Sequence, residues 1–113
     1  MIKFFGLLFI VWFIAANAAP PAQPATLVVF GDSLSAGYGL ETGQGWVALL
    51  QKKLQQEGLN YHVVNASISG DTSSGGLARI DQVLTQTKPR WLLLELGAND
   101  GLRGLSPKEM KAN

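Results

Sequence analysis

The continuous apolar run Leu27–Phe30 predicts a strand that is buried on both faces, because it lacks the alternation of apolar and polar positions typical of a half-exposed strand. Trp91–Leu96 is again nearly all apolar and predicts another strand. Tyr61–Asn65 predicts a third, shorter strand between them. Strands without alternation are typical of parallel sheets that helices cover on both sides.

Two segments between these strands show helical spacing instead. In the segment 46–57 the apolar residues share one helix face, polar residues such as Gln51 lie largely on the other, and Gly58 ends the helix. These apolar residues are Trp46, Leu49, Leu50 and Leu54. The segment 76–87 carries a second apolar stripe and is closed by Pro89. This stripe consists of Leu77, Ile80 and Leu84.

The order of the elements predicts an α/β fold. Strands and helices alternate with short connections, which implies parallel pairing, right-handed crossovers and helices on both faces of the sheet. A further helix is expected after Ser106, with Pro107 at its first position and Glu109 placed for a capping box. Because few residues follow this helix start and three strands leave open edges, we expect residues 26–113 to be the N-terminal part of a longer domain whose C-terminal part is missing.

The first residues predict an export signal. Lys3 precedes an apolar run from Phe4 to Ala15, and Ala16–Ala18 has the small-x-small pattern of a signal-peptidase site. The run is shorter than the ~20 residues of a membrane-spanning helix. We therefore expect a signal peptide at residues 1–18, cleaved after Ala18, then a proline-rich tether at residues 19–25, and a periplasmic or secreted protein.

Charge and composition exclude several classes of function. The 113 residues include nine basic and eight acidic side chains, and loss of Lys3 with the leader makes the remainder neutral. A neutral protein offers no electrostatic reason to bind nucleic acid or an anionic membrane. The absence of cysteine excludes disulfides, thiolate metal sites and cysteine nucleophiles, and the single histidine, His62, excludes a multi-histidine metal site.

Three polar loops follow the carboxyl ends of the three strands, where open parallel sheets bind ligands. The loops are Gly31–Ser35, Ser67–Asp71 and Gly97–Asp100. A serine just after a strand and flanked by glycine suits a nucleophile, and backbone N–H groups together with a side-chain amide suit an oxyanion hole. Taken singly, Ser33, Gly70 and Asn99 also fit ordinary turn or helix-cap roles, but together they favour a catalytic site.

These loops resemble the sequence blocks of the GDSL, or SGNH, hydrolase family. Gly31–Ser35 (GDSLS) is similar to the first block, Gly70 within Asn65–Thr72 (NASISGDT) to the second, and Gly97–Asp100 (GAND) to the third. The similarity continues through Leu34–Tyr38, Gly76–Arg79, Arg90–Trp91 and Gly101–Gly104. Over this extent, which is nearly all of the chain after the leader, the sequence resembles the branch of periplasmic thioesterase I, lysophospholipases and arylesterases.

The resemblance implies a flavodoxin-like, three-layer α/β/α fold and a serine hydrolase that acts through an acyl-serine. Ser33 would be the nucleophile, and the oxyanion hole would consist of the backbone N–H groups of Ser33 and Gly70 with the side-chain amide of Asn99. The implied substrates are small acyl esters and thioesters, including lysophospholipids, acyl-CoA and aryl esters. The resemblance implies no cofactor and no metal, and a protein that is a monomer when complete.

One block of the family does not occur in these 113 residues. It is the Asp-x-x-His block, which supplies the catalytic base and its orienting acid. His62 does not replace it, because it lies three residues before Asn65 and thus about 10 Å from the catalytic end of its strand. We therefore expect the chain as given to be inactive, and the alternative to an enzyme is a non-catalytic binding module of the same fold. Asp32, Asp71 and Asp100 are expected to form hydrogen bonds within their own turns.

Two further hypotheses concern glycine-containing segments. Gly101–Leu105 follows the oxyanion asparagine and carries Leu102 and Leu105, which predicts a mobile substrate rim that contacts the acyl chain. Gly37–Thr42 has threonine where a dinucleotide-binding fingerprint needs glycine or alanine, and it lies too far from the strand. We therefore expect no nucleotide site. An absorbance scan would distinguish a hydrolase from a flavin-binding protein of the same fold class.

Overall fold

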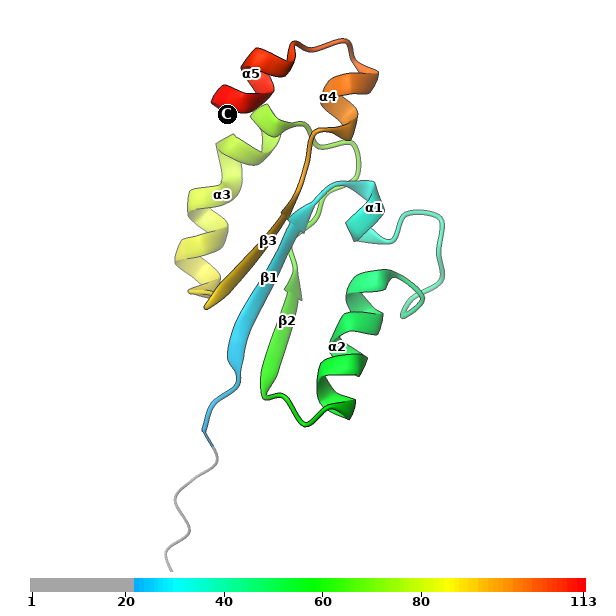
Figure 1. Cartoon of the computed structure of the whole chain (residues 1–113), viewed down its shortest axis with the longest axis vertical. Helices are drawn as coiled ribbons and strands as arrows, with labels where there is room; N and C mark the ends of the chain where they lie inside the picture. Colours follow the sequence, from blue (N-terminus) through cyan, green and yellow to red (C-terminus); the bar gives the residue numbers. More distant parts are fainter. Residues whose placement is uncertain (1–21) are drawn as a thin grey trace, which may run out of the picture.

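The structure of the chain is a computed structural model that describes residues 22–113 (Figure 1). The expected signal peptide, residues 1–18, and residues 19–21 of the expected tether lie outside the described residues. The first strand already begins at Ala25, the last residue of the expected tether, because the Ala25 N–H donates to the Asn60 carbonyl at 3.1 Å. Within residues 22–113 no helix is both long and apolar enough to span a membrane.

The three strands form one parallel sheet in the order β2-β1-β3. They are β1 (Ala25–Gly31), β2 (Tyr61–Asn65) and β3 (Trp91–Glu95). Leu27 of β1 is in register with Val63 on one side and with Trp91 on the other. The parallel α/β class predicted from the order of the elements is therefore confirmed.

Two-sided burial holds for the central strand only. Val28, Val29 and Phe30 of β1 are fully buried. In β3, an edge strand of the described residues, the Trp91 and Leu94 side chains are more than half exposed. A continuous apolar run does not distinguish a central strand from an edge strand, because that distinction depends on strand order.

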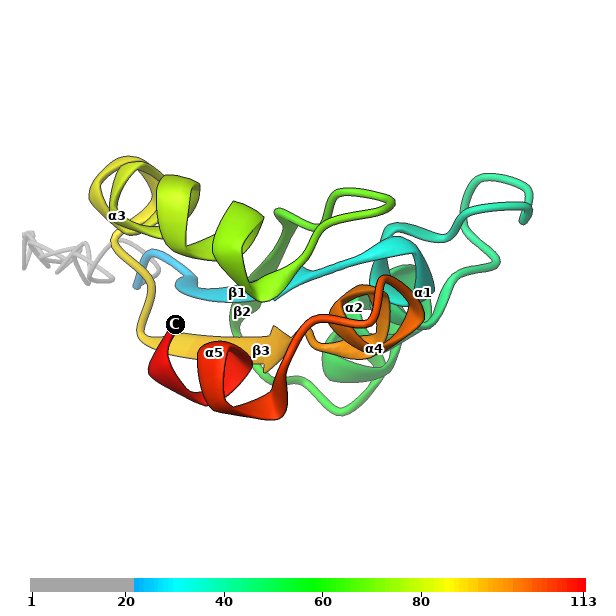
Figure 2. The same ribbon diagram turned by 90° about the horizontal axis from the view of Figure 1, so that it is seen from above.

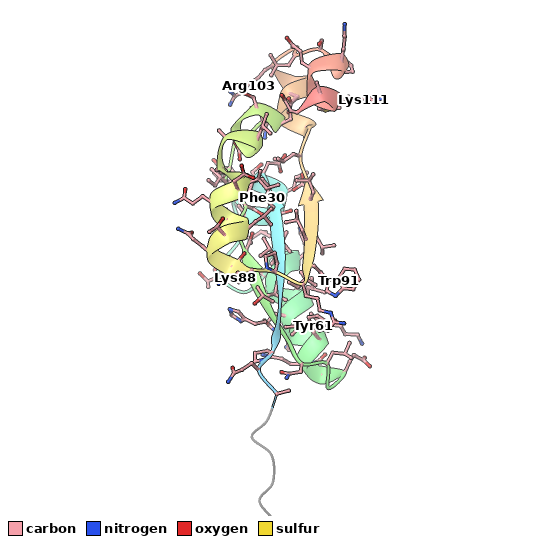
Figure 3. All side chains as sticks on the ribbon, turned by 90° about the vertical axis from the view of Figure 1, so that its left-hand side faces the viewer. Phe30, Tyr61, Lys88, Trp91, Arg103 and Lys111 are labelled. Carbon is pink, nitrogen blue, oxygen red and sulfur yellow. The ribbon has the colours of Figure 1, made fainter. Side chains whose placement is uncertain are left out.

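Two long helices cover opposite faces of the sheet (Figure 2). They are α2 (Trp46–Gln56) and α3 (Ser73–Thr87). The helix α3 begins three residues earlier than predicted, because the Thr72 hydroxyl accepts a hydrogen bond from Gly75 N at 3.2 Å and caps the first turn. Figure 3 shows Phe30 on the side of the sheet that α3 covers.

The buried face of α2 differs from the predicted one. Trp46 and Leu49 are exposed, whereas Val47 is buried and Gln51 is half-buried. Gln51 turns toward the sheet because its side-chain amide bonds to the backbone of β2, donating to Tyr61 O at 3.1 Å and accepting from Val63 N at 2.7 Å. Apolar periodicity alone cannot place Gln51 on the packed face, because Gln51 is polar and is held there by hydrogen bonds.

Three short helices gather at the carboxyl ends of the strands (Figure 1). They are α1 (Ser33–Ala36), α4 (Ala98–Leu102) and α5 (Pro107–Ala112). The start of α5 is as predicted, with the Ser106 hydroxyl accepting from Glu109 N at 3.2 Å. The second half of the capping box differs, because the Glu109 carboxylate accepts from the Ser106 hydroxyl and not from its backbone.

Candidate active site

The turn after β1 positions Ser33 as the first residue of α1. Asp32 is the N-cap, and its Oδ1 accepts from Leu34 N at 2.9 Å, so Asp32 bonds within its own turn as expected. Its carbonyl accepts from Ser35 N and Ala36 N, at 3.2 and 2.8 Å. Within the described residues, the backbone N–H of Ser33 is left without a hydrogen-bond partner at this turn. Ser33 itself is half-buried.

A partly buried hydrogen-bond network supports this turn. The Ser35 hydroxyl donates to Glu95 Oε1 at 2.6 Å, and the Ser35 carbonyl accepts from Asn65 Nδ2 at 2.7 Å. Glu95 ends β3 and Asn65 ends β2, so α1 is tied to both outer strands. Sequence reasoning missed this network, although Glu95 as the one charged residue of an otherwise apolar run was a usable signal.

The loop between β2 and α3, residues 66–72, carries Gly70 in the left-handed backbone conformation at φ 81°. A residue with a Cβ adopts this conformation only at a cost, which is the local reason for glycine here. The Asp71 N–H closes the turn by donating to Ile68 O at 3.2 Å. Within residues 22–113, the Gly70 N–H has no acceptor. The loop therefore presents a second unpaired amide at the same edge of the sheet.

The side chain of Asn99, which follows β3, bonds to both the turn after β1 and the loop after β2. Asn99 is the second residue of α4, and its Nδ2 donates to Asp71 O at 2.9 Å. A longer contact of 3.4 Å joins the same nitrogen to Asp32 Oδ2. The structure thus brings Asn99 next to residues that directly adjoin Gly70 and Ser33. The contact with Asp32 Oδ2 is the weaker of the two, and it would be the one to give way to an incoming acceptor.

Asp71 and Asp100 differ from the expectation that each bonds within its own turn. Asp71 Oδ2 accepts from Arg79 Nε at 2.8 Å, and Asp100 accepts from both the backbone and the hydroxyl of Ser73. Both partners lie on α3. The hydrogen bond from the Ser73 hydroxyl, followed by that from its backbone, holds the pKa of Asp100 below its usual value. These carboxylates therefore join the segments after β2 and β3 to α3 and do not shape single turns.

His62 lies far from this edge of the sheet. It is exposed on β2 and is in register with Thr26, five residues before Gly31, which corresponds to roughly 16 Å along the strand. That His62 is not the base for Ser33 stays a prediction. Among the residues that the structure describes, no group of three or more His, Cys, Asp or Glu side chains is placed to hold a metal ion.

The expected substrate rim, Gly101–Leu105, is more ordered than a loop. Its first two residues belong to α4, and Leu105 N donates to Asp100 O at 2.9 Å. Arg103 Nη2 donates to Gly70 O at 3.0 Å and so attaches the rim to the loop that carries Gly70. Leu102 is 85% exposed, with its side chain available for contact with a ligand.

The chain has the features that define the SGNH class of α/β proteins. They are a parallel sheet, Gly-Asp-Ser at the end of β1, a loop with glycine after β2 and Gly-x-Asn-Asp after β3. The model of the GDSL-like Lipase/Acylhydrolase family matches residues 29–113. The chain belongs to this family.

Several named relatives of the chain are esterases or thioesterases. It is 60% identical to esterase TesA of Pseudomonas aeruginosa over 92 residues, which cover 81% of this chain and 46% of that protein. It is 56% identical to thioesterase 1/protease 1/lysophospholipase L1 of Escherichia coli K12 over 88 residues, 78% of this chain and 41% of that one. The crystal structure of TesA superposes with a TM-score of 0.76 at 61% identity, covering 77% of this chain and 48% of that chain. The chain thus spans about half the length of the relatives it matches.

Proposed function

We propose that the protein is a serine hydrolase that cleaves small acyl esters and thioesters through an acyl-serine at Ser33. One observation carries the proposal. The backbone N–H groups of Ser33 and Gly70 have no partner within residues 22–113, and the Asn99 amide lies beside the residues that adjoin both. Backbone donors that the fold leaves unpaired suit an oxyanion that forms only in the transition state.

In this reaction the Ser33 oxygen attacks the acyl carbonyl carbon while a general base takes the hydroxyl proton. The carbonyl oxygen becomes the oxyanion, which accepts from Ser33 N, Gly70 N and Asn99 Nδ2. Collapse of the tetrahedral intermediate expels the alcohol or thiol, which takes up the proton, and leaves the acyl-serine. A water molecule then repeats the sequence and releases the carboxylic acid.

The base is expected from an Asp-x-x-His block, which the 113 residues do not contain. We therefore expect residues 1–113 by themselves to be inactive, since oxyanion donors without a base leave only a small part of the rate enhancement. The alternative is a non-catalytic module that binds acyl esters, which applies only if the complete protein places no base beside Ser33; His62 itself lies far from the carboxyl end of β1. We also propose that a complete protein needs no cofactor or metal, acts as a monomer and binds no nucleic acid.

The test uses the protein produced from its complete reading frame, assayed with p-nitrophenyl esters, acyl-CoA and a lysophospholipid. Ser33→Ala is expected to lower kcat by at least about a thousandfold, and Asn99→Ala by about a hundredfold to a thousandfold. Ser74→Ala, at an exposed position on α3, is the matched control and should leave kcat unchanged. Turnover that survives Ser33→Ala refutes the proposal. Ester binding without turnover in the unmutated protein supports the binding module instead.

The proposed location is the periplasm or the exterior of the cell, after removal of residues 1–18. This rests on Lys3, the apolar run that follows it and the small residues up to Ala18. N-terminal sequencing of the protein recovered from fractionated cells is expected to begin at Ala19. Recovery of an uncleaved N-terminus in the membrane fraction would contradict export with cleavage.

A further inference from the structure

The side chain of Arg79, on α3, contacts both ends of the loop that carries Gly70. Its Nη1 donates to Ala66 O at 2.6 Å, where the loop starts, and its Nε donates to Asp71 Oδ2 at 2.8 Å, directly after Gly70. The Arg79 and Asp71 side chains are only 18% and 11% exposed. A planar group that is shielded from water therefore fixes the span of this loop.

The same guanidinium reaches the end of β1, two residues before Ser33. Its Nη2 lies 3.5 Å from Gly31 O, and its carbon stands 3.8 Å from the centre of the Phe30 ring. Phe30 is fully buried, and Figure 3 shows it on the side of the sheet covered by α3. The ring lies against the guanidinium, whose Nη1 and Nη2 donate to the backbone carbonyls of Ala66 and Gly31 and whose Nε donates to the Asp71 carboxylate.

Asn99 depends on the same loop. Its side chain donates to Asp71 O, and the carboxylate of Asp71 accepts from Arg79. A displacement of Asp71 therefore moves the acceptor that orients the Asn99 amide, and it moves the adjacent Gly70 N–H as well.

We propose that Arg79 is a positioning residue for the oxyanion hole: it fixes the Gly70 N–H and the Asn99 amide relative to Ser33. The inference rests on the proposed function, because it needs an oxyanion at this point. Arg79 does not touch the reacting atoms. Its effect comes from the planar fork of N–H donors, which contacts Ala66, Asp71 and Gly31 while stacked on the Phe30 ring. A lysine has a single nitrogen and cannot reproduce these contacts together.

The first experiment is Arg79→Lys in the protein from its complete reading frame, with short p-nitrophenyl esters as substrates. We expect kcat to fall by about tenfold to a hundredfold, as for small displacements of catalytic groups, with KM within about twofold. Arg90→Lys, at an exposed arginine, is the matched control and should change neither constant. An unchanged kcat for Arg79→Lys, or a rise in KM alone, overturns the inference.

A second measurement separates positioning from a general loss of stability. Because Arg79 acts on the oxyanion in part through the Asn99 amide, Arg79→Lys should cost a smaller factor in kcat in the Asn99→Ala background than in the unmutated protein. Arg79→Ala should regain part of its kcat in millimolar guanidinium, with methylammonium as the control that lacks the planar fork. If Arg79→Ala does not fold, the test rests on the comparison of Arg79→Lys with and without Asn99→Ala. An equal loss of kcat in these two backgrounds overturns the inference.

Ser33→Ala in the same assay distinguishes the two failures. If Ser33→Ala leaves turnover intact, the proposed function fails and the role of Arg79 fails with it. If Ser33→Ala abolishes turnover and Arg79→Lys leaves kcat intact, only the role of Arg79 is refuted.

Discussion

The carboxylate of Asp100 accepts hydrogen bonds from both the backbone N–H and the hydroxyl of Ser73, at 2.8 and 2.6 Å. Asp100 is 2% exposed and directly follows Asn99, whereas Ser73 is the first residue of α3. The pair therefore joins the loop after β3 to the helix that follows the Gly70 loop. These bonds favour the ionised carboxylate, so the pKa of Asp100 lies below its ordinary value.

The pair predicts acid-sensitive folding. Because the pKa of Asp100 is lower in the folded protein than its ordinary value of 3.8, the stabilisation is fully present above pH 3.8 and is lost as the pH falls through the lower folded-state pKa. Asp100→Asn should lower the midpoint of urea denaturation at neutral pH and reduce the loss of stability on acidification. Denaturation curves between about pH 2 and pH 6 measure both effects.

Asp81→Asn, at an exposed position of α3, is the control for the loss of one carboxylate. It should keep the pH dependence of the unmutated protein. An equally steep loss of stability in Asp100→Asn would show that the Ser73 pair does not cause it.

The sequence predicted the elements whose signals are local. The three strands, α2 and α3 follow from apolar runs, helical spacing and terminators such as Pro89, and their boundaries differ from the structure by at most three residues. The helices α1 and α4 were missed because four and five residues are too few to show a helical period. Asp32 can be predicted as the N-cap of α1 only if Ser33 is already known to be the first residue of a helix.

The sequence was enough to predict which loops form the candidate site, but not the hydrogen bonds that join these loops. Ser33, Gly70 and Asn99 follow strand ends, where parallel sheets place their ligand sites. The bonds that join these loops connect residues distant in sequence, as in Asn99 with Asp71 and Asp100 with Ser73. No spacing rule along the chain reveals such pairs, because they depend on how the connections pack over the sheet.

A methyl group at Gly31 is expected to disrupt the support of the nucleophile turn. An added Cβ would lie 2.8 Å from the Glu95 carbonyl and 2.9 Å from Ser35 Oγ, and the backbone atom among these cannot move aside cheaply. Gly31→Ala should therefore lower the free energy of unfolding by about 1–3 kcal/mol and reduce kcat. Chemical denaturation and ester hydrolysis measure the two effects.

Gly101→Ala is the matched control, because an added Cβ there meets no atom within 4 Å and the residue is helical. It should leave stability unchanged or raise it by up to about 1 kcal/mol. Equal costs for the two substitutions would mean that crowding at Gly31 is not the cause.

Among the described residues β2 is an edge strand, and the Gln51 side chain bonds to its outer backbone groups, Tyr61 O and Val63 N, as a neighbouring strand would. Gln51→Ala should leave both groups unpaired, lower the free energy of unfolding by about 1–3 kcal/mol and promote aggregation through the edge. Gln51→Glu keeps the acceptor for Val63 N and should cost less. Urea denaturation and light scattering test this, with the exposed Gln55→Ala as control. No difference between Gln55→Ala and Gln51→Ala would contradict the role of the edge.

Leu102 tests the proposed substrate rim. Gly104 of this segment is unsuitable for the purpose, because it has φ 70° and its N–H donates to Gly101 O, so proline or alanine there would disturb the backbone itself. Leu102→Ala removes only an exposed side chain. If that side chain covers the acyl chain, kcat/KM for long-chain esters should fall by about tenfold, while acetyl esters, too short to reach it, change little. Leu59→Ala, at an exposed leucine before β2, should alter neither, and equal losses for long and short esters in Leu102→Ala would refute the rim.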